Sequence, residues 1–122
     1  GIVSVVAGKI KKYQIERLIV DPVMLAKGGR SLLLAKARRT LVEKLLPLTL
    51  VVTPNIPEAE KLAGVEIKSV AGMKKAAFLI RKLGVQNVII KGGHQPVRKN
   101  QRLLIFFTRA ENIMNIVLLG LT

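Results

Sequence analysis

The sequence predicts an α/β protein in which helices cover both faces of a mainly parallel sheet. Two features of the sequence indicate this fold class, namely its short apolar runs and its longer segments with helical spacing. Short continuous apolar runs, typical of strands buried on both faces, alternate with longer segments whose apolar residues recur at helical spacing. Strands that alternate with helices are joined by right-handed crossovers into a parallel sheet. The chain has 122 residues, half of them hydrophobic, so we expect one domain and exclude a disordered protein.

Four segments have the features of helices: residues 2–13, 31–46, 57–64 and 69–83. Pro47 is expected to close the second helix, and Gly64 to end the third. Ser69 is a suitable N-cap for the fourth helix, which Gly84 stops. The residues expected to face the core are Ile2, Val6, Ile10 and Tyr13; Leu34, Ala37, Leu41 and Leu45; and Val70, Met73, Ala77, Ile80 and Leu83.

Three apolar runs are expected to form buried strands: residues 17–20, 49–53 and 87–91. Further along, residues 103–107 fit an edge strand, and residues 113–119 fit either a strand or a helix. No internal repeat or interdomain linker interrupts the chain.

Polar or charged residues follow each of the three expected strands. Asp21 comes after the first strand, Asn55 after the second, and Lys91 at the end of the third, before two glycines. In open α/β sheets, ligands bind at the carboxyl ends of the strands. We therefore expect these residues to face one crevice. Each segment also has a purely structural interpretation, because Asp21-Pro22 can begin a turn and Gly92-Gly93 can reverse the chain.

Asn55 and Glu58 stand three residues apart where a strand passes into a helix. The N-terminus of a helix favours anions such as phosphates, which a lone carboxylate would repel. Glu58 suits such a site if a divalent cation lies between, and magnesium prefers one or two carboxylates with waters and phosphate oxygens. The alternative is that Asn55 caps the helix and Glu58 complements its dipole.

Three motifs together resemble the hydroxymethylpyrimidine/phosphomethylpyrimidine kinases of thiamine biosynthesis, which belong to the ribokinase-like superfamily. They are Asp21-Pro22-Val23-Met24, Thr53-Pro54-Asn55-x-x-Glu58-Ala59 and Val88-Ile89-Ile90-Lys91-Gly92-Gly93-His94. The second motif is common to many ribokinase-like kinases, whereas the other two narrow the resemblance to the pyrimidine and pyridoxine kinases. The resemblance covers residues 1–94 and implies part of a three-layer α/β/α fold. Residues 95–122 form an atypical tail within the same single domain.

The resemblance implies ATP and Mg²⁺ as cofactors. Asn55 and Glu58 would then organise the magnesium ion and its waters, and Lys91 would neutralise charge on the nucleotide phosphates. Thr53, in the same motif as Asn55, is expected to belong to the cofactor-binding segment.

The resemblance also implies a small aminopyrimidine substrate, with a pyridoxine-like ring left open as an alternative. Val23 would touch the ring, and Asp21 would shape the same loop close to the metal. We assign no catalytic role to His94, because a single histidine after a Gly-Gly turn is usually structural.

The chain departs from the family in its later part. Family members carry a Gly-Thr-Gly-Cys-like segment, where a helix N-terminus forms an anion hole for the transferred phosphoryl group. No Gly-x-Gly follows Gly93. We therefore assign no catalytic residue and expect a truncated form with little or no activity. Sheet edges left open by missing strands would favour a homo-oligomer.

The chain is strongly basic, with 21 Lys and Arg against 7 Asp and Glu. This surplus supports an alternative function as a basic, non-catalytic α/β module that binds nucleic acid or another polyanion. However, three Phe, one Tyr and no Trp leave few side chains that could stack on bases. A nucleic-acid partner is therefore not the leading expectation.

The chain has no cysteine, which excludes a disulfide scaffold and is compatible with the reducing cytoplasm. It also lacks an apolar run as long as the roughly 18 residues that a membrane helix requires. A cytoplasmic protein with no membrane contact is expected.

Overall fold

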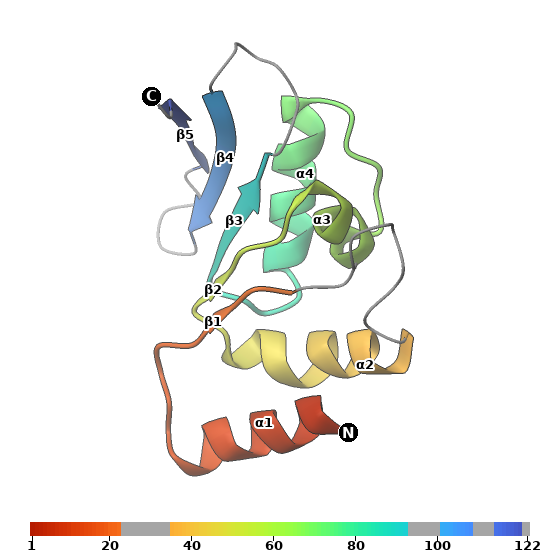
Figure 1. Ribbon diagram of the computed structural model, residues 1–122, viewed down its shortest axis with the longest axis vertical. Helices are drawn as coiled ribbons and strands as arrows, with labels where there is room; N and C mark the ends of the chain where they lie inside the picture. The colour runs from red at the N-terminus through yellow and green to blue at the C-terminus, as the bar shows by residue number, and fades with distance from the viewer. Residues whose placement is uncertain (23–34, 93–100, 109–113, 121–122) are drawn as a thin grey trace.

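The computed structural model describes residues 1–22, 35–92, 101–108 and 114–120, and these residues form one five-stranded sheet with helices beside it (Figure 1). The elements, in order, are α1 (Ile2–Lys12), β1 (Ile19–Val20), α2 (Ala35–Thr40), the π-helical turn η1 (Leu41–Leu45), the 3₁₀ turn η2 (Leu46–Leu48), β2 (Val51–Val52), α3 (Ile56–Ala63), α4 (Val70–Arg81), β3 (Asn87–Lys91), β4 (Gln101–Thr108) and β5 (Met114–Gly120).

The sheet has the strand order β1-β2-β3-β4-β5. The first three strands are parallel to one another, while β4 and β5 continue the sheet as antiparallel neighbours. The parallel register places Val20, Val52 and Val88 in one row across three strands. The predicted α/β class is confirmed, and its parallel part is the part formed from residues 19–91.

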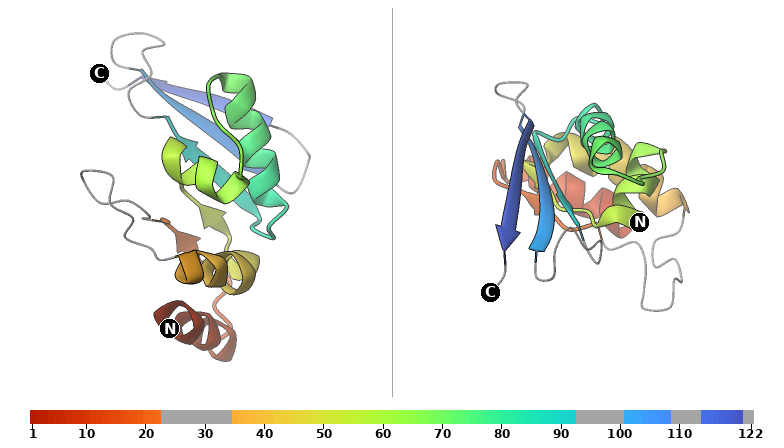
Figure 2. Two further views of the ribbon diagram at one scale, coloured as in Figure 1. Left: turned by 90° about the vertical axis from the view of Figure 1, so that its right-hand side faces the viewer. Right: turned by 90° about the horizontal axis from the view of Figure 1, so that it is seen from above.

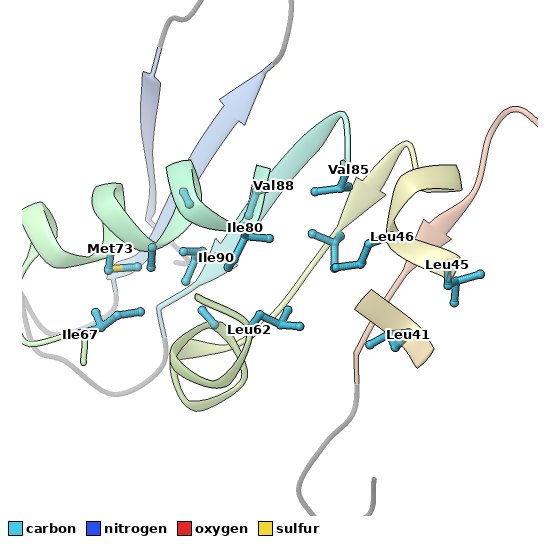
Figure 3. Packing of buried hydrophobic residues seen from close by; sticks show 14 of the residues in the cluster. Leu41, Leu45, Leu46, Leu62, Ile67, Met73, Ile80, Val85, Val88 and Ile90 are labelled. Atoms are coloured by element: carbon cyan, nitrogen blue, oxygen red, sulfur yellow. The ribbon is translucent and has the colours of Figure 1, made fainter. Parts of the chain in front are cut away.

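The core lies between the sheet and helices α3 and α4, which lie side by side (Figure 2). Both helices contact β3, and α4 also contacts β4. Val88 and Ile90 on β3 are fully buried, and Ile80 on α4 packs beside them (Figure 3). Leu41 and Leu46 extend this core past β2. Alternate residues of β3 point to the opposite face, where Ile89 is half-buried.

Helices α3 and α4 follow the local rules that predicted them. Helix α3 ends at Gly64, whose φ of 70° lies in the left-handed region that glycine adopts without strain. The Ser69 hydroxyl accepts a hydrogen bond from the backbone N–H of Gly72, as expected of an N-cap. Gly84 has a φ of 110° and ends the turn after α4.

The second predicted helix extends further than expected. Its described part continues through η1 and then η2, so Pro47 lies inside a 3₁₀ turn and does not end the helix. The wider π turn brings Leu45 and Leu46 into the core together, although they are adjacent in sequence. Residues 31–34, including Leu34, lie outside the described residues.

The predicted inward face of α1 is mostly wrong. Ile10 is buried as expected, but Ile2 is 83% exposed, and Val6 and Tyr13 are also exposed. Ala7 is buried together with Ile10. The turn η1 packs against a face of α1 that is displaced by about one residue from the predicted face. The helix is apolar on more than one side, so spacing alone does not select the contacting face.

Burial of the strands also differs from the prediction. The run at residues 17–20 is predicted to be buried, but only Ile19–Val20 is strand. Ile19 is 67% exposed because, among the described strands, β1 pairs with β2 alone. Strand β4 is not at the edge of the sheet, since β5 pairs with it over residues 101–107. The sequence of residues 113–119 fitted either a strand or a helix, and the structure shows the strand β5 there.

Of the five positions that were predicted to face inward from the fourth helix, three are buried and two are not. Met73, Ala77 and Ile80 are buried as expected, whereas Leu83 is only half-buried. Val70 is exposed because it is the first residue of the helix and lies at its rim.

Candidate functional site

The three parallel strands bring their carboxyl ends to one rim of the sheet. Asp21 and Thr53 each come one residue beyond the row of valines, and the Thr53 N–H donates to the Val20 carbonyl at 3.0 Å. Further along, the Lys91 N–H donates to the Pro54 carbonyl at 2.8 Å, and Asn55 pairs with Lys91 in a parallel bridge. The expectation that the strand-end segments meet at one place is confirmed for these residues.

One carboxylate oxygen of Asp21, which follows β1, contacts side chains at the ends of β2 and β3. Asp21 Oδ1 accepts a hydrogen bond from Thr53 Oγ1 at 3.3 Å and another from Lys91 Nζ at 3.1 Å. The second contact is an ion pair, with the Lys91 side chain 44% exposed and that of Asp21 54% exposed. An incoming anion can therefore reach the ammonium group without displacing a buried side chain.

Asn55 and Glu58 form a reciprocal capping box at the start of α3. Asn55 Oδ1 accepts from the Glu58 N–H, and Glu58 Oε2 accepts from the Asn55 N–H, each at 2.9 Å. The structural interpretation of this pair as a helix cap is confirmed. Glu58 is nevertheless unusually well buried for an acidic residue, at 4% exposure. The cap thus fixes a buried carboxyl group beside the bridge between Asn55 and Lys91.

The donor types at this rim suit magnesium better than zinc. The described residues hold no group of three or more His, Cys, Asp or Glu side chains that could enclose a metal ion. Magnesium is usually held by one or two carboxylates, with waters and substrate phosphates completing its shell. The rim offers oxygen ligands of this type in the carboxylates of Asp21 and Glu58. The amide oxygen of Asn55 is a further oxygen ligand.

Two residues of the sequence-based site lie outside the described residues. They are Val23, expected at the substrate ring, and His94, to which no role was assigned. What sequence reasoning missed is the pairing of Asp21 with Lys91, which are 70 residues apart. Their positions at strand ends indicated that they would be near one another, but no local signal indicates which side chains touch.

Comparison with known proteins gives the same family from both sequence and structure. The family model described as phosphomethylpyrimidine kinase matches residues 1–116. The chain belongs to the phosphomethylpyrimidine kinase family. A hydroxymethylpyrimidine/phosphomethylpyrimidine kinase of Bacillus subtilis is 52% identical over 101 residues, which are 83% of this chain and 37% of that protein.

Solved structures of kinases show that this family fold extends through the described chain. The phosphomethylpyrimidine kinase of Clostridium difficile matches with a TM-score of 0.80 and 37% identity, over 94% of this chain and 48% of that one. A Staphylococcus aureus pyridoxal kinase in complex with AMP-PCP matches with a TM-score of 0.81 and 28% identity, over 98% of this chain and 42% of that one. The chain therefore spans less than half the length of these relatives.

Membership of the phosphomethylpyrimidine kinase family gives no support to the alternative of a basic polyanion-binding module. The match also continues to residue 116, so most of the tail that the sequence marked as atypical falls inside the family model. Within the described part of the chain, none of the helices combines the length and the apolar character needed to cross a bilayer.

Proposed function

We propose that this chain forms the magnesium-nucleotide part of a kinase that transfers the γ-phosphoryl group of ATP to hydroxymethylpyrimidine or its monophosphate, in thiamine biosynthesis in the cytoplasm. The observation that carries the proposal is the arrangement of a lysine and two carboxylates at one rim of parallel strands, in a chain of this family. A relative with an ATP analogue bound supports ATP as the phosphoryl donor.

In this proposal each residue at the rim has a separate task. The Lys91 ammonium neutralises negative charge on the nucleotide phosphates, a task that suits an exposed point charge. Asn55 and Glu58 hold Mg²⁺ and its waters, while the capping box keeps both side chains in place. Thr53 lines the nucleotide side of the rim. Held by Asn55 and Glu58, Mg²⁺ would offset the negative charge that develops on the phosphates during transfer.

The substrate attacks the γ-phosphorus through its hydroxyl oxygen, or through a phosphate oxygen when it is the monophosphate. The bond to the β,γ-bridging oxygen breaks, ADP leaves, and the proton of an attacking hydroxyl passes to solvent. In this reaction the protein contributes mainly positioning and charge stabilisation. We place Val23 and Asp21 on the aminopyrimidine side of the site. Because no Gly-x-Gly follows Gly93 in the 122 residues, we expect this polypeptide to bind Mg-ATP weakly and turn over little. Loss of one oxyanion donor alone costs about a hundredfold or more in rate.

Calorimetric titration with ATP, with and without magnesium, tests the proposal. We expect the variant Lys91→Met to weaken binding with or without the metal, and Glu58→Gln to reduce mainly the magnesium-dependent part. Gln can still accept the capping hydrogen bond, so Glu58→Gln changes the charge and spares the cap. Lys68→Met and Glu66→Gln make the same charge changes at an exposed ion pair and serve as matched controls. No binding of millimolar Mg-ATP to the unmodified chain would overturn the proposal.

A pyridoxal-like substrate is the second candidate, supported by the similarity to the S. aureus pyridoxal kinase. Equilibrium dialysis with hydroxymethylpyrimidine and pyridoxal, each in the presence of Mg-AMP-PCP, separates the two. Preferential retention of the pyrimidine supports the first candidate, and preferential retention of pyridoxal supports the second.

A further inference from the structure

We propose that Asp21 is a positioning residue, whose carboxylate holds Lys91 at the end of its strand and so prepares its ammonium group for the phosphates of a nucleotide. The inference deepens the proposed function and rests on it. It adds a role for Asp21 that acts through Lys91 and not through the substrate or the metal.

The geometry at Asp21 carries the inference. A single oxygen, Oδ1, accepts hydrogen bonds from Lys91 Nζ at 3.1 Å and from Thr53 Oγ1 at 3.3 Å. The Thr53 hydroxyl fixes the orientation of the carboxylate, because Thr53 is itself tied to β1 by its backbone hydrogen bond to Val20. The carboxylate thus links the ends of β1, β2 and β3.

The Lys91 backbone is also held independently of its side chain. Its N–H donates to the Pro54 carbonyl at 2.8 Å, and Pro54 is fully buried. The part of Lys91 that remains free to move is therefore its long side chain. A lysine side chain loses considerable rotamer entropy when it is immobilised, so holding it before the ligand arrives lowers the cost of binding.

Lysine has three N–H donors, and the contact with Asp21 occupies one of them. The Lys91 ammonium can therefore keep Asp21 and donate to a phosphate oxygen at the same time. Its side chain is 44% exposed, which leaves the group accessible. Asp21 itself carries a negative charge, which by direct repulsion would weaken the binding of ATP. The two effects thus predict opposite results for the removal of Asp21. ATP binds more weakly if Asp21 positions Lys91, and more tightly if Asp21 only repels the nucleotide.

A double-mutant cycle with ATP titration uses this difference in sign. In the unmodified background, Asp21→Ala is expected to weaken ATP binding by about three- to tenfold, since each immobilised side chain costs up to about a factor of ten. In the Lys91→Met background, Asp21→Ala is expected to leave binding unchanged or to tighten it. Asp21→Asn, which keeps an acceptor oxygen, is expected to retain part of the effect. Tighter binding in both backgrounds, or an equal loss in both, would overturn the inference.

A second measurement decides the inference independently of nucleotide binding. The coupling between Asp21→Ala and Lys91→Met in urea unfolding is expected to exceed that between Glu66→Ala and Lys68→Met, a more exposed pair whose charged atoms lie 3.5 Å apart. If the chain binds no ATP, the proposed function fails, while this coupling still shows whether Asp21 holds Lys91. A coupling no larger than that of the control pair would overturn the positioning role.

Discussion

Two regions of the molecule bury apolar side chains to different extents. In the closed region, formed by β2, β3, α3 and α4, Val52, Val88 and Ile80 are fully inaccessible to solvent. In the open region, formed by α1 and β1, Ile2 and Ile19 are largely exposed. Both regions are rich in branched aliphatic residues, so composition does not distinguish them. Burial therefore depends on the neighbours that an element finds, and α1 and β1 each have few among the described residues.

Removing a branched aliphatic side chain from each region tests this difference most directly. Ile80→Ala in the closed region is expected to cost about 2–5 kcal/mol in the free energy of unfolding, because it leaves a cavity among fully buried neighbours. Val5→Ala on the exposed side of α1 is expected to stay within about 0.5 kcal/mol. Urea denaturation measures both, and equal losses would show that α1 is as well packed as α4.

Glycine substitutions are expected to change stability with opposite signs in α1 and in the turn after α4. At Gly84, φ is 110° and an added Cβ would lie 3.2 Å from Cα of Pro47, so Gly84→Ala is expected to destabilise by about 1–3 kcal/mol. At Gly8, inside α1, an added Cβ meets nothing within 4 Å. Gly8→Ala is therefore expected to stabilise by about 0.5–1 kcal/mol. The shift in urea midpoint tests both, and a stabilising Gly84→Ala would contradict the strained turn.

The capping box of α3 is expected to have an intermediate effect. Glu58→Ala removes a buried acceptor of the Asn55 N–H and is predicted to cost about 1–2 kcal/mol. Glu66→Ala removes an exposed carboxylate and should change the stability by no more than about 0.5 kcal/mol. Thermal unfolding followed by circular dichroism compares the two variants. A loss for Glu66→Ala as large as that for Glu58→Ala would count against the cap.

The smallest expected effect concerns association through the open region. Its exposed apolar side chains and the free edge of β1 are features that promote self-association. Ile19→Lys is expected to lower the sedimentation coefficient measured at high protein concentration, with little change in stability. Phe78→Lys, on the exposed side of α4, is the control and should leave association unchanged. If Phe78→Lys lowered the sedimentation coefficient and Ile19→Lys did not, the association surface would lie on α4 instead.

Much of the fold follows from local signals in the sequence. Strand β3 has the predicted bounds, Ser69 caps α4, and Gly64 ends α3. The alternation of helix and apolar strand also indicated that Asp21, Asn55 and Lys91 would share one rim. The family was identified from the same strand-end motifs, and the family model confirms it. The proposed roles of these residues in binding remain predictions.

The local elements follow from the sequence, because caps, glycine ends and apolar runs act through hydrogen bonds and backbone conformations within a few residues. Three features could be seen only in the folded molecule: which face of α1 is buried, that β1 lies at the edge of the described sheet, and that one oxygen of Asp21 accepts a hydrogen bond from Lys91, 70 residues away. These features depend on contacts between segments distant in sequence. Apolar spacing shows that a side chain is able to be buried, whereas the neighbouring elements determine whether it is.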